Sequence, residues 1–107
     1  MNITVAIPSY NKEKYIRKCL DSIVKNKNDI SKIIVVDNCS TDKTFEIAKS
    51  YAPDVMSIQN ETNVGMSPNW NRCIDVCETE WLMIFHADDE MLPGAIRSEE
   101  HTSELQS

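Results

Sequence analysis

The sequence predicts an α/β domain built on a parallel β-sheet that helices cover on both faces. Four strand-like apolar runs alternate along the chain with three segments of helical periodicity. Repeated strand–helix units of this kind form parallel sheets through right-handed crossovers. The last run, Trp81–Phe85, has five consecutive apolar residues, which is typical of a strand buried on both faces.

The first half of the chain predicts two strands and a long helix between them. Ile3–Ile7 is the first strand, and Lys32–Val36 is the second. The helix is expected over Lys12–Asn26, with Asn11 as its N-cap. Apolar residues at i, i+3, i+4, i+7 and i+8 of this helix predict one buried stripe. These residues are Ile16, Cys19, Leu20, Ile23 and Val24.

A second helix is predicted from about residue 42 to residue 51. Ser40 or Thr41 is suited to cap its first turn, and Pro53 ends it. Val55–Ile58 follows as a short third strand. No repeat, linker or low-complexity segment interrupts the alternation of strands and helices.

The third helix is expected to begin at Ser67 and Pro68, with serine as the N-cap and proline in the first helical position. Its apolar residues at i, i+3, i+4 and i+7 predict one face packed inward. These residues are Trp70, Cys73, Ile74 and Cys77. Because no second ligand pair accompanies Cys73 and Cys77, a core-facing pair is a better interpretation than a zinc site.

Composition excludes several classes of protein. The 107 residues carry a formal charge of −6 without a run of Lys or Arg, which argues against nucleic acid as a partner. No apolar stretch approaches the length of a membrane span, and no signal peptide precedes the strand at Ile3. We therefore expect a cytoplasmic protein whose four cysteines are reduced thiols.

The last eleven residues, Arg97–Ser107, match residue for residue the translation of a common short-read sequencing adapter. The alternative is a genuine polar C-terminal tail. We expect an artefact without function, as with a fusion scar, and a natural sequence of Met1–Ile96 cut from a longer reading frame. Removing one Arg and three Glu leaves a charge of −4, and the 96 residues form one domain or part of one.

Polar residues follow each predicted strand. Ligands of open α/β sheets bind beyond the carboxyl ends of the strands, so these residues are expected to converge there. They are Pro8, Ser9, Tyr10 and Asn11; Asp37 and Asn38; Asn60, Asn63 and Gly65; and Asp88 and Asp89. Structural alternatives exist for each cluster: a cap at Ser9 or Asn11, an Asx-turn at Asp37, and a positive φ at Gly65.

The acidic pair Asp88 and Asp89 is the strongest of these signals. Two adjacent carboxylates beyond a buried strand repel each other and lose hydration, and a hard divalent cation compensates for both effects. A solvated acidic turn before Pro93 is the alternative. His86, just before the pair, is expected to be a satisfied histidine at the strand end rather than a metal ligand.

Four motifs in this order resemble those of family 2 glycosyltransferases. They are Val5–Asn11, Ile33–Asp42, Asn63–Gly65 and Phe85–Asp89, and the resemblance covers essentially all of Met1–Ile96. It implies a Rossmann-like GT-A fold for nucleotide-diphosphate sugars, here truncated. The chain departs from the commonest pattern at His86, which stands where the first carboxylate of the Asp-x-Asp region often is.

The resemblance also implies roles for individual residues. Asp37, with Asn38 beside it, would accept a hydrogen bond from the nucleobase, and Pro8, Ser9 and Tyr10 would line the base and ribose pocket. The turn Asn63–Gly65 would let the backbone approach the nucleotide, and Arg72 or Asn69 would reach the diphosphate. Asp88 and Asp89 would serve the metal, one carboxylate binding Mg²⁺ or Mn²⁺ and the other the ribose; which does which is open.

The implied reaction is transfer of the sugar to an acceptor hydroxyl, usually with inversion. The acceptor would be a saccharide, a lipid-linked molecule or another hydroxyl compound, and the full-length parent could associate peripherally with the inner face of the membrane. The catalytic base is expected downstream, so the fragment itself is expected to be inactive. Two alternatives are a Mg²⁺-dependent phosphoryl-transfer enzyme and a nucleotide-binding module without catalysis.

Overall fold

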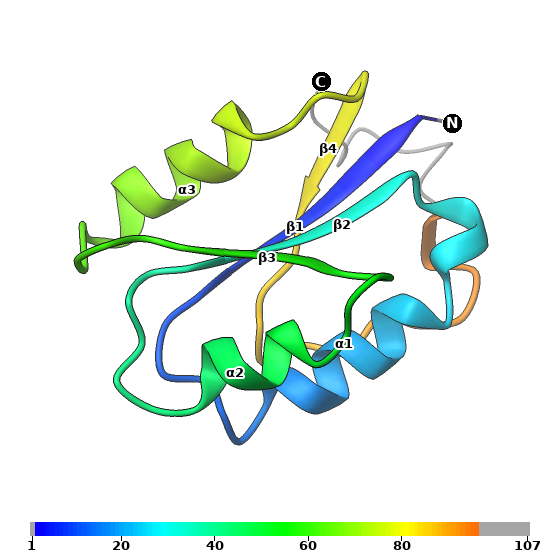
Figure 1. Ribbon diagram of the computed structural model, residues 1–107. Helices are drawn as coiled ribbons and strands as arrows, with labels where there is room; N and C mark the ends of the chain where they lie inside the picture. The colour runs from blue at the N-terminus through cyan, green and yellow to red at the C-terminus, as the bar shows by residue number, and fades with distance from the viewer. Residues whose placement is uncertain (1, 97–107) are drawn as a thin grey trace.

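The structure, a computed structural model, describes residues 2–96, and the predicted adapter-derived tail lies outside them. Four parallel strands form one sheet in the order β3–β2–β1–β4 (Figure 1). The strands are β1 (Ile3–Ser9), β2 (Lys32–Asp37), β3 (Met56–Gln59) and β4 (Trp81–Ile84). The parallel sheet predicted from the alternation of strands and helices is confirmed.

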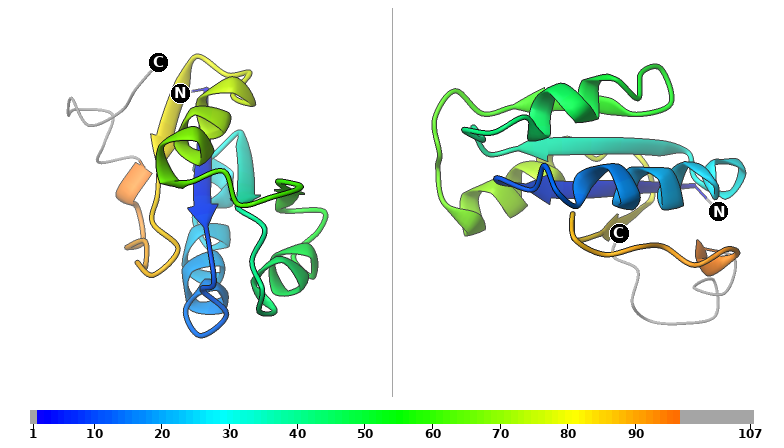
Figure 2. Two further views of the ribbon diagram at one scale, coloured as in Figure 1. Left: turned by 90° about the vertical axis from the view of Figure 1, so that its left-hand side faces the viewer. Right: turned by 90° about the horizontal axis from the view of Figure 1, so that it is seen from below.

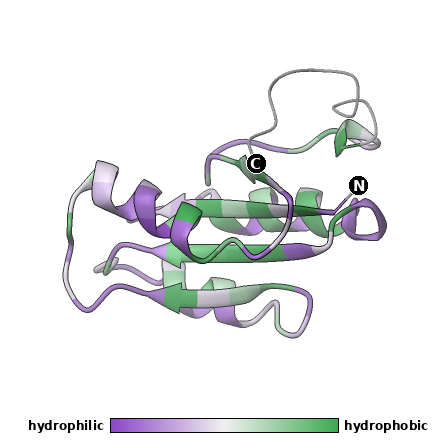
Figure 3. Ribbon diagram, turned by 90° about the horizontal axis from the view of Figure 1, so that it is seen from above, coloured by the Kyte–Doolittle hydropathy of each residue, from purple (hydrophilic) through white to green (hydrophobic). Residues whose placement is uncertain are grey.

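Helices lie on both faces of this sheet, as predicted (Figures 1 and 2). One face carries α1 (Ile16–Val24) and α2 (Thr44–Lys49), and the other carries α3 (Met66–Asp75). A short 3₁₀ helix, η1 (Lys27–Asp29), leads from α1 to β2. Figure 3 shows hydrophobic strands at the centre and hydrophilic connections around them.

The core on the α1 and α2 face is the larger of the two. Ile3, Val5 and Ile7 alternate along β1 and pack with the buried stripe of α1, of which only Val24 is partly exposed. Ala6 points to the other face and packs with Cys73 of α3. The alternation along β1 therefore holds the sheet between two helical layers.

The register aligns the carboxyl ends of the strands. Ser9 of β1 lies opposite Asp37 of β2, and Asp37 lies opposite Gln59 of β3. The backbone pairing continues one step beyond β2, since Asn38 N donates to Ser9 O at 2.8 Å. The polar residues that follow the strands consequently meet at one edge of the sheet.

The predicted start of the first helix is wrong. Asn11 does not cap it; Asn11 has a positive φ of 51°, and its Oδ1 accepts a hydrogen bond from Thr41 N at 2.8 Å. Residues 12–15 form a turn, and the regular helix runs from Ile16 to Val24. Asparagine tolerates this left-handed conformation better than most residues. Here the Asn11 side chain connects the turn after β1 to the loop after β2 instead of capping the helix.

The predicted cap of the second helix is also wrong. Neither Ser40 nor Thr41 caps α2; the carboxylate of Asp42 accepts from Thr44 N at 2.9 Å. The Ser40 hydroxyl donates to Asp37 instead, at 2.6 Å. The helix ends at Lys49, earlier than predicted, and turn residues follow it.

The third helix differs from the prediction in its start and in its buried face. It begins at Met66 with Gly65 as N-cap, so Ser67 and Pro68 both lie in its first turn. The buried residues are Asn69 and Cys73, whereas Ile74 is 49% exposed. The face is rotated because the Asn69 amide hydrogen-bonds beneath the helix, which apolar periodicity does not register.

The predicted burial of the fourth strand on both faces is only partial within residues 2–96, although both of its faces pack against a core. β4 pairs only with β1, and of its four residues only Leu82 is buried. The segment after β4 turns back onto α1, where Met91 N donates to Ser22 Oγ at 2.8 Å. Residues 2–96 contain no helix long and apolar enough to cross a membrane.

The four cysteines are free thiols, as predicted. Of the expected core-facing pair, Cys73 is buried and Cys77 is only partly buried. Burial raises the pKa of the Cys73 thiol to about 12. Within the described part of the chain, no group of three His, Cys, Asp or Glu side chains is arranged to hold a metal ion.

Candidate functional site

A cleft of about 460 Å³ opens at the carboxyl ends of the strands. Its walls come from the turns after β1, β2 and β4, from the loop that precedes α3, and from the first turns of α3. The lining residues are Pro8, Ser9, Tyr10, Lys12, Asn38, Asn63, Gly65, Met66, Asn69, Trp70, His86, Ala87 and Asp88. This is the position at which open α/β sheets bind ligands.

The cleft contains most of the residues singled out from the sequence. Eight of those given a binding role line it: Pro8, Ser9, Tyr10, Asn38, Asn63, Gly65, Asn69 and Asp88. Asp37, Arg72 and Asp89 do not line it. Arg72 lines a second, more open hollow beside β3.

Asp37 lies behind the cleft wall with its carboxylate fully buried. Oδ1 accepts from the hydroxyls of Ser9 (3.1 Å) and Ser40 (2.6 Å). Oδ2 accepts from Ser40 N (2.8 Å) and from Gln59 Nε2 (3.0 Å). Four donors therefore occupy both oxygens, and in this conformation Asp37 acts on the cleft only through the residues that it holds.

Asn38, the neighbouring residue, does line the cleft, and its side-chain amide also makes four hydrogen bonds within the protein. Nδ2 donates to Asn63 Oδ1 (2.9 Å) and to Gly65 O (3.1 Å). Oδ1 accepts from Asn60 Nδ2 (2.9 Å) and from Val64 N (3.0 Å). A single side chain thus holds the loop 60–65 against the end of β2.

Gly65 is the residue of this loop that needs glycine. Its φ is +91°, a conformation that residues with a side chain adopt at a cost. An added Cβ would have ordinary contact with Pro68 Cδ at 3.7 Å, so the requirement comes from the backbone and not from space. The interpretation of Gly65 as a positive-φ residue is confirmed, and its carbonyl is also an acceptor for Asn38.

An aromatic pair closes the side of the cleft nearest α3. The rings of Trp70 and His86 have centroids 5.7 Å apart and are inclined by 50°. Below them, the buried Asn69 donates from Nδ2 to Val36 O (3.2 Å) and accepts from Asn60 Nδ2 (2.7 Å). Tyr10, 41% exposed, provides another aromatic surface to the cleft.

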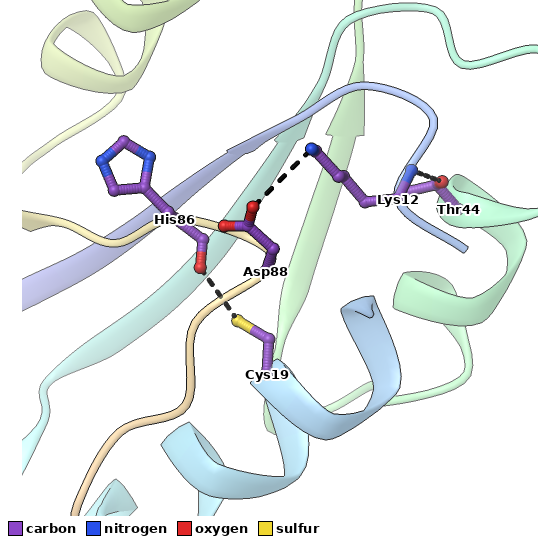
Figure 4. A network of polar contacts seen from close by, with 5 residues as sticks. All are labelled: Lys12, Cys19, Thr44, His86 and Asp88. Carbon is purple, nitrogen blue, oxygen red and sulfur yellow. Dashed lines mark hydrogen bonds and ion pairs between the residues drawn. The ribbon is translucent and has the colours of Figure 1, made fainter. Parts of the chain in front are cut away.

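The acidic end of the cleft is more open. Asp88 Oδ2 lies 3.8 Å from Lys12 Nζ, with both side chains partly exposed (Figure 4). Asp89 is exposed, and its backbone N–H donates to His86 O at 3.1 Å. Sequence reasoning missed Lys12 as a site residue because it placed this lysine on the first helix, whereas it lies in the turn after β1.

The acidic residues after β4 contribute to the raised pKa of a buried thiol, that of Cys19 on α1. Burial, and to a lesser extent the negative charges of Asp89, Asp88 and Glu90, raise the pKa of the Cys19 thiol to about 12. Cys19 Sγ donates to His86 O at 3.5 Å (Figure 4). The negative potential of the acidic turn therefore extends through the end of β4 to α1.

Comparisons with known proteins agree on one family. The sequence profile described as glycosyl transferase family 2 matches residues 4–98. A PGL/p-HBAD biosynthesis glycosyltransferase of Mycobacterium bovis is 32% identical over 91 residues, which are 82% of this chain and 36% of the relative. The SPbeta prophage-derived glycosyltransferase SunS of Bacillus subtilis is 38% identical over 87 residues, 81% of this chain and 20% of that protein.

Solved structures have the same fold. S. aureus TarS 1-349 in complex with UDP-GlcNAc superposes with a TM-score of 0.83 and 31% identity, over 94% of this chain and 30% of the TarS 1-349 chain. The mannosyltransferase PcManGT from Pyrobaculum calidifontis, solved with GDP-Man and Mn²⁺, has a TM-score of 0.75 at 24% identity, over 88% of this chain and 29% of that one. The chain spans 20–36% of the length of the relatives named here.

Proposed function

Because the chain belongs to glycosyl transferase family 2, we propose that its cleft binds the donor of a glycosyl transfer, a nucleotide-diphosphate sugar. One observation carries the proposal: polar residues from three strand ends and from the loop before α3 line a single cleft at the carboxyl edge of a parallel sheet. TarS, with 31% identity and the same fold, has been solved with UDP-GlcNAc, which supports a donor of this class.

The nucleoside would occupy the end of the cleft formed by β1 and β2. Pro8 and Tyr10 offer apolar and aromatic surface to the base, and the Ser9 hydroxyl offers a hydrogen bond to base or ribose. Asn38 and Asn63 border this end. Asp37 would act from behind, by orienting the Ser9 hydroxyl, rather than by direct contact with the base.

The diphosphate would lie toward Asp88, where a divalent cation fits the residues present. Hard cations such as Mg²⁺ take oxygen ligands and are commonly held by one or two carboxylates together with substrate phosphates and water. Asp88 lines the cleft and offers such a carboxylate, and Asp89 adds negative charge one residue further on. The ion would neutralise the charge that develops on the leaving diphosphate.

The reaction would be displacement at the anomeric carbon of the bound sugar by an acceptor hydroxyl, with inversion. The cleft residues bind and orient the donor. The acceptor site and the general base that deprotonates the hydroxyl would come from the part of the relatives that this chain does not span. Activity of the whole protein therefore depends on residues beyond those described.

Donor binding can be measured by tryptophan fluorescence. The chain has two tryptophans, and only Trp70 lines the cleft, so Trp81→Phe gives a protein whose emission reports on the cleft alone. We expect UDP or GDP to change this emission saturably and to bind more tightly with Mn²⁺ than with a chelator. Asp88→Ala should lower affinity with Mn²⁺ by about 10- to 100-fold, as expected for a charged contact, and should not lower it with the chelator.

Asp89→Ala is the matched control, because this neighbouring carboxylate lies outside the cleft. We expect a smaller loss of affinity for it than for Asp88→Ala. If neither UDP nor GDP binds in the presence of Mn²⁺, the proposed donor site is wrong. Equal loss in the two variants would contradict the choice of Asp88 as the metal-binding carboxylate.

A further inference from the structure

We propose that Lys12 binds the diphosphate of the donor, and that Asp88 pairs with Lys12 only while the cleft is empty. The inference rests on the proposed function and deepens it, because it couples phosphate binding to metal binding at one site. In the described structure Lys12 Nζ lies 3.8 Å from Asp88 Oδ2 across the cleft (Figure 4).

The fold fixes the backbone position of Lys12. Its backbone N–H donates to Thr44 Oγ1 at 2.7 Å, which fastens the turn after β1 to the first residue of α2. Asn11 directs the chain into this turn with its positive φ. The backbone of Lys12 is therefore fixed, while its side chain, 38% exposed, remains able to move within the cleft.

Charge at the cleft makes Lys12 the natural partner of a phosphate. Among the residues that line the cleft, Lys12 is the one Lys or Arg, and Asp88 is the one Asp or Glu. The adjacent turn adds the acidic residues Asp89 and Glu90, and the chain without residues 97–107 carries −4. A diphosphate entering this region needs a cation, and Lys12 is the cation that the cleft itself supplies.

The pair between Lys12 and Asp88 is easily exchanged. At 3.8 Å and with side chains 38% and 50% exposed, it is a long, solvent-screened contact. A phosphate with more negative charge than one carboxylate is a stronger acceptor for the ammonium group. When Lys12 turns to the phosphate, Asp88 loses its cation and becomes available to the divalent ion.

This exchange predicts that binding of the diphosphate and binding of the divalent metal strengthen each other. In the empty cleft Lys12 competes with the metal for Asp88, whereas in the loaded cleft each cation has its own anionic partner. The coupling is reciprocal, so the diphosphate should raise metal affinity by the same factor by which metal raises diphosphate affinity. Arg72 does not offer the same exchange, since it lines the other hollow.

The test uses the Trp81→Phe chain with Lys12→Met, Lys12→Arg and the control Lys14→Met, whose exposed lysine does not line the cleft. The probes are uridine and UDP in chelator. We expect Lys12→Met to weaken UDP about 10- to 100-fold and to leave uridine within about twofold, since uridine has no phosphate. Lys12→Arg should keep most of the affinity, and Lys14→Met all of it.

A second measurement follows Mn²⁺ alone by the electron paramagnetic resonance of the free ion. Lys12→Met should bind Mn²⁺ several-fold more tightly than the wild type, because Asp88 is no longer paired. Unchanged UDP affinity in Lys12→Met, or equal losses for UDP and uridine, would overturn the role of Lys12 as a phosphate ligand. If the wild type binds no nucleotide, the proposed function fails, and titration with inorganic pyrophosphate decides the role of Lys12 by itself.

Discussion

The polar residues after the central strands and those after β4 have the same sequence signature but different physical roles. Asp37 ends β2 and Asn38 follows it, and each side chain makes four hydrogen bonds within the protein. Asp88 follows β4, is half exposed and makes one long ion pair. The first region holds the loops of the cleft in place, and the second keeps its charge available for a ligand.

Strand order explains the difference. β2 has a neighbour on each side, so its last residue, Asp37, receives donors from Ser9 of β1 and from Gln59 of β3. β4 pairs with β1 alone within residues 2–96, and the turn that follows it has fewer protein donors nearby. The central position of β2 therefore supplies two of the four donors to Asp37, and the loops beside it supply the rest.

The largest expected effect is on stability, from Asp37→Ala. The change removes an acceptor of four hydrogen bonds and leaves the buried hydroxyl of Ser9 and the partly buried donors of Ser40 unpaired, so we expect a loss of about 3–5 kcal/mol in the free energy of unfolding. Asp88→Ala, the same substitution at the exposed end, should change it by no more than about 0.5 kcal/mol. Urea unfolding monitored by circular dichroism measures both, and similar losses would refute the comparison.

Asn38→Asp sharpens the comparison without changing side-chain size. A carboxylate cannot donate, so the hydrogen bonds to Asn63 Oδ1 and Gly65 O become contacts between acceptors. We expect a loss of about 1–3 kcal/mol in unfolding free energy and faster proteolysis within residues 60–65. A variant as stable as the wild type would mean that these bonds do not hold the loop.

The buried thiols predict a weakening at alkaline pH. Burial raises the pKa of Cys73 from 9.0 to about 12, so above pH 9 the unfolded chain releases a proton that the folded chain keeps. Stability is thus fully present below pH 9 and falls as pH rises toward 12, by about 2 kcal/mol for Cys73 between pH 9 and pH 10.5. Urea unfolding at several pH values should show a shallower decline for Cys73→Ala.

The same measurement of stability against pH can be made for Cys19, whose thiol is affected by the acidic residues after β4. Burial is again the main cause of its raised pKa, but the carboxylates of Asp89, Asp88 and Glu90 contribute there. High salt screens such charges, so 1 M NaCl should reduce the alkaline loss due to Cys19 more than that due to Cys73. An identical response of Cys19→Ala and Cys73→Ala to salt would contradict the electrostatic difference between the regions.

The smallest effects are expected at the two glycines with positive φ. Gly65 (+91°) and Gly94 (+76°) both have room for a Cβ, so alanine at either position should cost about 1–2 kcal/mol of stability through backbone strain. Only Gly65→Ala should also weaken nucleotide binding, because Gly65 lines the cleft and accepts from Asn38. Equal effects on binding would argue against the loop as part of the site.

Much of the fold could be predicted because its signals are local. Apolar runs and helical periodicity identified the strands, the buried stripe of α1 and the two helical layers. The start of α1, the cap of α2 and the inward face of α3 could not be predicted in this way. Each depends on a specific side-chain hydrogen bond that the spacing of apolar residues does not reveal: Thr41 to Asn11, Ser40 to Asp37 rather than to α2, and Asn60 to Asn69.

The sequence by itself determined that polar residues follow each strand and, from its motifs, which family they resemble. Only the tertiary structure decided which of them face the cleft: Asn38 but not Asp37, and Asp88 but not Asp89. It also brought Lys12 to Asp88, 76 residues further along the chain, because β1 and β4 are neighbours. Strand order and register set these contacts, and neither is encoded in the spacing of residues along one strand or helix.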